Sequence, residues 1–113
     1  MKIVVDTSVI IAVIANEPEK PLLIEKTRDF ELIAPLSLRW EIGNAFSAMI
    51  KRGRITLAQA KTALGIFTSL SIQTVNVEME KVLEIVDEQK VYAYDAYMKA
   101  CALSHICPIA NIR

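Results

Sequence analysis

The feature that most constrains the fold is an alternation of short apolar runs with longer segments of helical periodicity. Four runs have strand character: residues 2–5 (KIVV), 30–34 (FELIA), 71–77 (SIQTVNV) and 108–112 (PIANI). The helical segments are residues 8–15, 19–27, 36–52, a stretch that starts at Thr56, 78–89 and 95–104. The segment 78–89 is expected to turn Met79, Val82, Leu83 and Val86 inward. Because strands joined by crossover helices pair in parallel, this order predicts an α/β fold with a parallel sheet.

Length and composition fit one domain that spans residues 1–113. The 113 residues are 53% hydrophobic, which is enough for a sizeable core. Thirteen basic and thirteen acidic residues cancel, so a nucleic-acid contact would have to come from a local patch or a bound metal. Two cysteines are too few for a disulfide framework, which favours the reducing cytoplasm. The apolar run at residues 8–15 is too short to cross a bilayer and no clear cleavage site follows, so neither a membrane span nor a signal peptide is expected.

Three acidic residues far apart in the sequence, Asp6, Glu41 and Asp95, lie where apolar segments begin or end. A carboxylate is costly to place beside a core unless a partner compensates for its charge. Sites in parallel sheets gather at the carboxyl ends of the strands, and Asp6 directly follows the first strand. We therefore expect the three carboxylates to share one pocket, whose oxygen ligands would suit Mg²⁺ or Mn²⁺.

Each acid also has a purely structural interpretation. Asp6 and Asp95 lie at expected helix N-termini, where a capping carboxylate contributes about 1 kcal/mol. Glu41 lies near a helix start, where the macrodipole favours a negative charge. Both interpretations stay open for each acid at this point.

Three further polar residues accompany the acids. Thr7 and Ser8 follow Asp6 and can either orient its carboxylate or cap the next helix. Asn44 follows Glu41 by three positions, so both side chains can share one helix face. Together they would add hydroxyl and amide groups to the expected pocket.

The densest basic run is Lys51, Arg52 and Arg54, which flank Gly53. The structural interpretation is that these cations complement the C-terminus of a helix that Gly53 closes. The functional interpretation is an edge that contacts the phosphates of RNA.

Aromatic side chains surround Asp95. Tyr92, Tyr94 and Tyr97 could stack on the bases of a single strand, although Tyr97 could equally belong to the core. The single histidine, His105, lies near the end of an apolar helix and is expected to pack or cap.

Taken together, these residues resemble the PIN domain family, most closely the VapC toxins of VapBC type II toxin–antitoxin pairs. The matching segments are residues 4–9 (VVDTSV), 41–45 (EIGNA) and 94–97 (YDAY), and residues 16–19 (NEPE) are similar to the segment after the first helix. The resemblance covers essentially the whole chain in order and spacing. It implies a Rossmann-like three-layer α/β/α sandwich.

The resemblance also implies an activity and a site. A protein of this kind would be an Mg²⁺- or Mn²⁺-dependent endoribonuclease with RNA as substrate and a cognate antitoxin as partner. By this match, the acids that bind the metal and carry out catalysis are Asp6, Glu41 and Asp95. The supporting polar residues are Thr7, Ser8 and Asn44.

The sequence departs from the family at its end. Family members usually continue from a Cys-Pro-apolar strand into a Thr-x-Asp turn, a helix and a last strand. Here Asn111 stands at the position of the hydroxyl residue and Arg113 at that of the fourth acid, and the C-terminal helix and last strand are missing. This departure affects the expected catalysis more than the expected fold.

Two functions follow from these features. The first is a toxin that cleaves RNA, in which metal held by the acids activates a water for attack on a phosphodiester. The second is an impaired or inactive PIN-like protein that binds an antitoxin or its own copy. Association, including a homodimer, is expected because Leu57, Leu64 and Phe67 could form an exposed apolar face and the missing strand would leave a sheet edge open. A generic nucleotide-binding module is disfavoured because the sequence has no glycine-rich phosphate loop.

Overall fold

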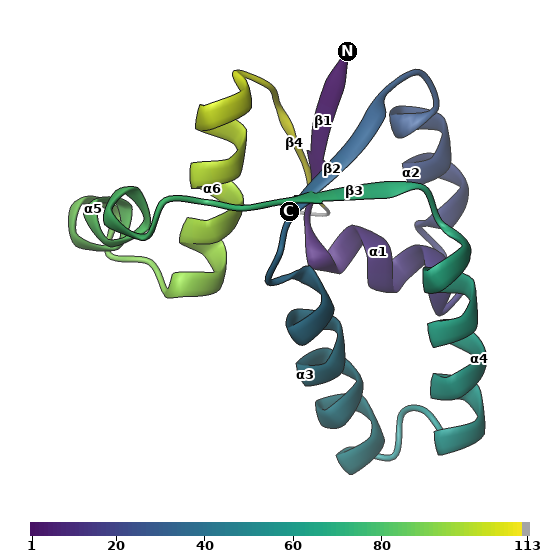
Figure 1. The fold of residues 1–113 in the computed structure, drawn as a ribbon. Helices are drawn as coiled ribbons and strands as arrows, with labels where there is room; N and C mark the ends of the chain where they lie inside the picture. Colours follow the sequence, from purple (N-terminus) through teal and green to yellow (C-terminus); the bar gives the residue numbers. More distant parts are fainter. Residues whose placement is uncertain (112–113) are drawn as a thin grey trace.

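A parallel sheet of four strands forms the centre of the structure, a computed structural model that describes residues 1–111 (Figure 1). The strands are β1 (Lys2–Val5), β2 (Glu31–Pro35), β3 (Ile72–Val75) and β4 (Ile109–Ala110). Their order across the sheet is β3-β2-β1-β4, and every neighbouring pair is parallel. Val4 in β1 pairs with Ile33 on one side and with Ile109 on the other. The predicted parallel α/β sheet is confirmed.

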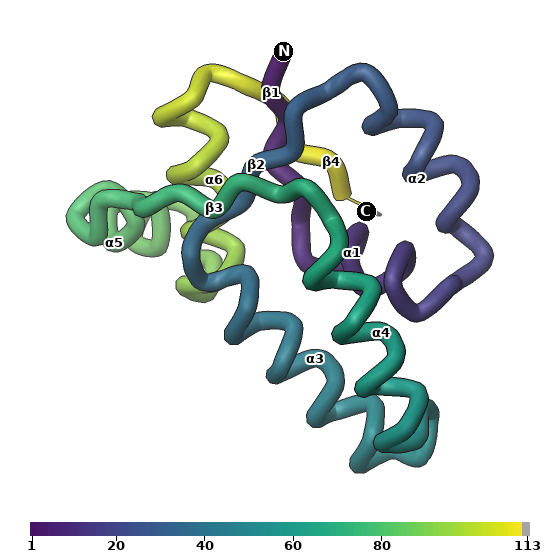
Figure 2. The backbone as a smooth tube through the Cα atoms, turned by 45° about the vertical axis from the view of Figure 1, so that its right-hand side comes forward, coloured from purple at the N-terminus to yellow at the C-terminus, as the bar shows by residue number. Residues whose placement is uncertain are grey.

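Helices cover both faces of this sheet. Within the described residues they are α1 (Thr7–Ile14), α2 (Lys20–Thr27), α3 (Leu38–Lys51), α4 (Leu57–Ser69), α5 (Met79–Gln89) and α6 (Ala93–His105). α6 packs against β1 and β2 with α5 outside it, whereas α1 and α2 lie on the other face (Figure 1). α3 and α4 extend from the sheet as a helical hairpin (Figure 2). This is the expected three-layer sandwich, with element ends shifted by up to two residues, and the strand end predicted at Ile112 lies outside the described residues. None of the helices in residues 1–111 is both long and apolar enough to span a membrane.

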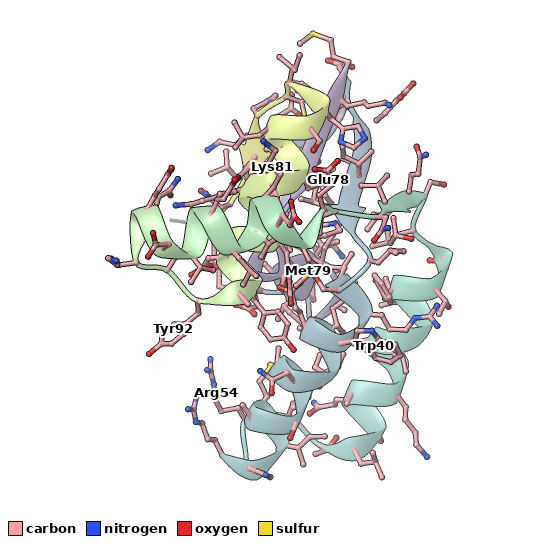
Figure 3. All side chains as sticks on the ribbon, turned by 60° about the vertical axis from the view of Figure 1, so that its left-hand side comes forward. Trp40, Arg54, Glu78, Met79, Lys81 and Tyr92 are labelled. Carbon is pink, nitrogen blue, oxygen red and sulfur yellow. The ribbon has the colours of Figure 1, made fainter. Side chains whose placement is uncertain are left out.

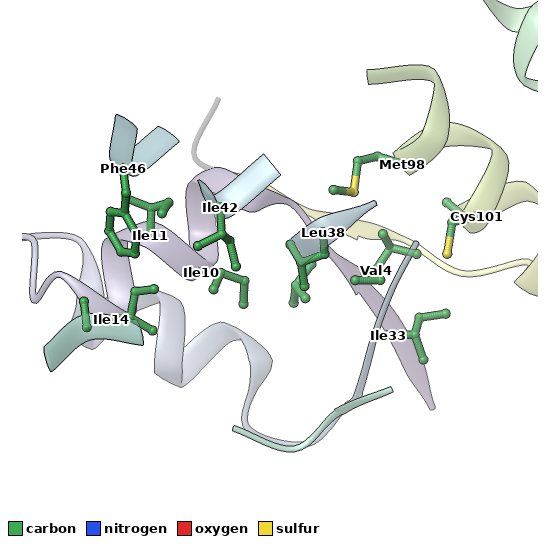
Figure 4. Close-up of a cluster of buried hydrophobic side chains, with 14 of the residues drawn as sticks. Val4, Ile10, Ile11, Ile14, Ile33, Leu38, Ile42, Phe46, Met98 and Cys101 are labelled. Carbon is green, nitrogen blue, oxygen red and sulfur yellow. The ribbon is translucent and has the colours of Figure 1, made fainter. Parts of the chain in front are cut away.

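The core lies between the sheet and the helices (Figure 4). Its buried side chains include Val4 and Ile33 in the strands, Ile10 in α1, Leu38 in α3 and Cys101 in α6. Strands that are covered on both faces are apolar at successive positions, which explains the unbroken run in β1. Because this cluster joins α1, α3 and α6 through β1 and β2, it fixes the three helices whose N-terminal ends carry the acids.

Local sequence signals set the turn between α3 and α4 as predicted. Gly53 adopts a φ of +70° just after α3, and the N–H of Arg54 donates a hydrogen bond to the carbonyl of Met49, as in a Schellman motif. Thr56 caps α4 in a reciprocal capping box with Gln59. These short-range bonds fix the position of the turn at the end of the hairpin.

The inward face predicted for α5 is wrong at two positions. Val82 and Ile85 are buried and Val86 is partly buried, but Met79 and Leu83 are exposed by 53% and 60%. The reason is that α5 packs mainly against α6 and not against the sheet (Figure 1). A single helix neighbour covers only a narrow apolar stripe.

Candidate active site

The N-terminal ends of three helices bring the predicted acids to one edge of the sheet. Asp6 follows β1 directly and is the N-cap of α1. Glu41 lies in the first turn of α3, which follows β2, and Asp95 lies in the first turn of α6. In Figure 1 these helix ends lie toward the lower end of β1. That end is the carboxyl edge, where sites in parallel sheets are found.

Asp6 acts as a helix cap at this edge. Its Oδ2 accepts hydrogen bonds from the backbone N–H of Ser8, at 3.2 Å, and from the Ser8 hydroxyl. The N–H of Asp6 donates to the carbonyl of Ala110 in β4 at 3.0 Å. The capping interpretation is therefore confirmed for Asp6. Both side-chain bonds end on Oδ2, which leaves the second oxygen, Oδ1, for another partner.

Glu41 is a charged residue that the fold buries, with only 7% of its surface exposed. Its Oε1 accepts a hydrogen bond from the Thr7 hydroxyl at 2.9 Å. Its Oε2 accepts a hydrogen bond from the Ser37 hydroxyl at 2.6 Å. Two hydroxyls from separate segments therefore satisfy both oxygens of this carboxylate, as a buried charge requires. A glutamate placed only to complement the macrodipole would have no need of such burial.

The pKa of Glu41 is governed first by its burial. Burial raises the pKa of Glu41 above its ordinary value of 4.5, and the hydrogen bonds from Ser37 and Thr7 oppose this rise. The negative charges of Asp6 and Asp95 raise the pKa further. Asp6 and Asp95 therefore contribute to the field at Glu41, although theirs are the smallest of the effects on its pKa.

Asp95 is exposed and does not cap α6, contrary to the prediction. The helix begins at Ala93, with Tyr92 at the N-cap position and no side-chain bond from that cap. No capping signal marks Tyr92 in the sequence, because tyrosine is not a favoured N-cap residue. Asp95 therefore contributes an accessible carboxylate, which still interacts favourably with the helix macrodipole.

Ser8 contacts Asp6, as one of its two interpretations predicts, whereas Thr7 contacts Glu41 and not Asp6. Asn44 lies exposed on α3, one turn after Glu41. Ser37 is a site residue that the sequence did not predict. The signal that would have revealed it is its position four residues before Glu41 at a helix start, because side chains at that spacing share a face.

The donor atoms at this edge suit a hard divalent cation, but the acids do not form a chelating group as they stand. Carboxylate and hydroxyl oxygens are the ligands that Mg²⁺ and Mn²⁺ prefer. Within residues 1–111, however, no group of three or more Asp, Glu, His or Cys side chains is arranged so that it could hold a metal ion. The geometry defines a concentration of negative charge and not a formed metal centre.

The basic residues lie away from the acids. Lys51, Arg52 and Arg54 are exposed at the far end of α3 and in the turn that follows. At 1.5 Å per residue, Lys51 is about 15 Å along the helix axis from Glu41. Figure 2 shows this turn at the end of the hairpin, away from the sheet.

The aromatic residues near Asp95 divide into two groups. Tyr97 is partly buried in the cluster between α5 and α6, and its ring lies 5.9 Å from that of Tyr94, so it belongs to the core. Tyr92 and Tyr94 are exposed by 89% and 44%. His105 has the capping role expected of it, because its Nδ1 lies 3.0 Å from the carbonyl oxygen of Cys101.

A cavity of about 770 Å³ lies elsewhere, between α1, α2 and the starts of β2 and β3. Its lining is mostly apolar and includes Val9, Ile24 and Phe30. Val5, next to Asp6, reaches this cavity, but none of the three acids lines it. We therefore place the candidate chemistry at the carboxyl edge, where the titratable groups gather, and not in this cavity.

The fold and the edge define a class of protein: a three-layer α/β domain that concentrates carboxylates at the carboxyl ends of its strands. The chain belongs to the PIN domain family, whose model matches residues 3–111. A search of the curated proteins found no match. PIN domains are generally nucleases and typically use divalent metals, so membership indicates a nuclease-type function. Of the two departures at the chain end, Asn111 is exposed, and Arg113 lies outside the described residues.

Proposed function

We propose that this protein is an Mg²⁺- or Mn²⁺-dependent endoribonuclease, the toxin of a VapBC-type toxin–antitoxin pair. The observation that carries the proposal is the buried carboxylate of Glu41, held by Thr7 and Ser37 beside the charges of Asp6 and Asp95. Burying a carboxylate near two others opposes folding, and groups perturbed in this way are concentrated at functional sites. Membership of a nuclease family supports the same conclusion.

The three acids would hold the metal ion, which would supply charge stabilisation and a more acidic water for hydrolysis of a phosphodiester. The chain's own residues have separate roles in this proposal. Thr7 and Ser37 orient Glu41, and Ser8 orients the N-cap carboxylate. Asp95, which is exposed, would be accessible to water and substrate, and one of the three acids would act as general base for the attacking water.

Cleavage of a labelled RNA by wild type and Asp6→Asn tests this function. We expect cleavage in Mg²⁺ or Mn²⁺, none in EDTA, and a loss of at least about tenfold in Asp6→Asn, since the metal-assisted step depends on the acids. Asp29→Asn is the matched control, because Asp29 is an exposed acid next to the start of β2, at the other edge of the sheet. Circular dichroism must show that all three proteins are folded. Equal activity of wild type and Asp6→Asn in both metals would reject the proposal.

A second candidate function is a PIN-domain protein that binds a partner without cleaving RNA. The observation that favours it is that no three acids within residues 1–111 form a chelating group. Titration calorimetry with Mn²⁺ separates the two candidates. Heat of binding that Asp6→Asn abolishes supports the nuclease, whereas a protein that neither binds Mn²⁺ nor cleaves RNA would be a partner-binding domain.

We also propose that the protein associates with an antitoxin and with a second copy, in the cytoplasm. Leu57 and Leu64 on α4 are exposed by 61% and 46%, which supports an apolar contact surface. Phe67, expected on the same face, is instead partly buried against the core. Cys101 and Cys107 are both free, as a reducing compartment would keep them. A mass by light scattering that falls to that of a monomer in Leu64→Lys would support self-association through α4, and a monomeric wild type would count against it.

A further inference from the structure

One face of α3 joins the acidic edge to the cationic turn at the other end of the helix. Glu41, Asn44, Ala48 and Lys51 follow one another at spacings of three and four residues, so their side chains lie along one face. Arg52 lies about three full turns after Glu41 and falls on the same face. Asn44, Lys51 and Arg52 are exposed. We call this face, defined by these five residues, the α3 track.

The cations at the end of the track are available to bind an anion. None of the salt bridges within residues 1–111 includes Lys51, Arg52 or Arg54. The macrodipole favours positive charge at a helix C-terminus, but its effect is confined to the last turn and does not require three cations. Three cations lie within four residues here, so this turn is a local concentration of positive charge in a chain that has no net charge.

We propose that the α3 track binds the phosphate backbone of single-stranded RNA, with the scissile phosphate at the acidic edge and a neighbouring phosphate at Lys51 and Arg52. This inference rests on the proposed ribonuclease function and names the path of its substrate. The carboxylates alone repel a polyanion, and the whole chain provides no attractive field. Cations about 15 Å from Glu41 supply that attraction without neutralising the acids.

The exposed tyrosines favour a single strand over a duplex. Tyr92 and Tyr94 lie just before Asp95 and expose 89% and 44% of their surfaces. Aromatic rings of this kind stack on unpaired bases, whereas the bases of a duplex are stacked on each other and offer no free face. In Figure 3 the side chain of Tyr92, at the N-cap of α6, and that of Arg54, in the hairpin turn, both project to the left of the view. Exposed rings next to Asp95 and exposed cations at the end of α3 offer base contacts and phosphate contacts to the same extended strand.

Fluorescence anisotropy with a labelled single-stranded RNA in EDTA measures binding without cleavage. We expect the double variant Lys51→Ala/Arg52→Ala to bind about tenfold more weakly at low salt, and its slope of log K against log salt to fall by about 0.7 for each cation removed. The charge-preserving variant Lys51→Arg/Arg52→Lys should bind as wild type does. Lys26→Ala is the matched control, because Lys26 is an exposed cation on α2 that forms none of the salt bridges found in residues 1–111.

The outcomes separate this inference from the proposed function. If the double variant binds RNA with the affinity and salt slope of wild type, the α3 track is wrong even if the protein cleaves RNA. If wild type binds RNA through Lys51 and Arg52 as expected but does not cleave it, the α3 track is supported and the ribonuclease proposal is rejected. Equal binding of duplex RNA would overturn the single-stranded assignment. If the double variant binds RNA as wild type does but no longer binds a polyglutamate peptide that wild type binds, the track proposal is overturned and the turn instead docks an acidic protein.

Discussion

Thr7 in α1 donates a 2.9 Å hydrogen bond to Glu41 in α3, across 34 positions of the sequence. The bond joins the helix that follows β1 to the helix that follows β2. Together with Ser37, it satisfies both oxygens of a buried carboxylate. The same contact therefore links the stability of the fold to the geometry of the candidate site.

Replacing Thr7 by valine should destabilise the protein. The change keeps the shape of the side chain but leaves Oε1 of Glu41 without its donor, which lowers the free energy of unfolding by about 1–3 kcal/mol. Thr7→Ser keeps the hydroxyl and should lose less. Urea denaturation at neutral pH measures the difference. If the valine and serine variants unfold at the same urea concentration, the hydrogen bond contributes nothing.

Glu41→Gln should stabilise the protein more at high pH than at low pH. Because the pKa of Glu41 is raised in the folded state, the folded protein binds the proton more tightly than the unfolded chain does. The free energy of unfolding therefore falls as the pH rises above 4.5, the ordinary value. Glutamine carries no charge and removes this loss. Melting temperatures of both proteins, measured at pH 4.5 and at stepwise higher pH, test the sign. A stabilisation that shrinks as the pH rises would contradict the assignment.

Asp6→Asn and Asp6→Ala should have opposite effects on stability without metal. Asparagine keeps the capping oxygen for the N–H of Ser8 and removes a charge that repels Glu41, so the melting temperature should rise. Alanine removes the cap, which should lower the free energy of unfolding by about 1 kcal/mol. Calorimetric scans in EDTA measure both. An asparagine variant that melts no higher than wild type would show that charge repulsion at this edge is negligible, and one that melts as low as the alanine variant would show that the capping oxygen contributes nothing.

Alanine should have opposite effects at two glycines of the same region. Gly53 has a φ of +70°, which an L side chain rarely adopts, so Gly53→Ala should destabilise by about 1 kcal/mol. Gly43 lies inside α3 with no atom within 4 Å of an added Cβ, so Gly43→Ala should stabilise by about 0.5–1 kcal/mol. Guanidinium denaturation of each variant decides. Equal shifts of the same sign would show that backbone conformation does not control the turn.

Much of the fold follows from local signals in the sequence. The unbroken apolar run before Asp6 predicts a buried parallel strand, and Gly53 and Thr56 mark a helix end and a helix start where the structure has them. These signals work because caps, turns and strand burial depend on nearby residues. The position of Asp6 after the first strand was also enough to place it at the carboxyl edge.

The sequence could not reveal features that depend on packing between distant segments. Met79 and Leu83 have the spacing of buried residues, but burial depends on how much of α5 a neighbour covers. Ser37 has a role because Glu41 is buried and needs a donor, and no local sequence pattern predicts that burial. The prediction that Asp95 caps α6 is wrong because the N-cap is Tyr92, a residue type with no capping preference.

The placement of α5 outside α6 has a consequence for how the candidate site responds to local opening. α5 is anchored chiefly by Val82 and Ile85 against α6, so it can detach at a smaller free energy than the sheet. Asp6 and Glu41 belong to segments fastened to β1 and β2, whereas Asp95 lies on the helix that α5 covers. Loosening the outer layer therefore affects one carboxylate and spares the other two. The acids at the carboxyl edge therefore come from both sides of the sheet, and all three keep their positions only while the helices on both sides stay packed.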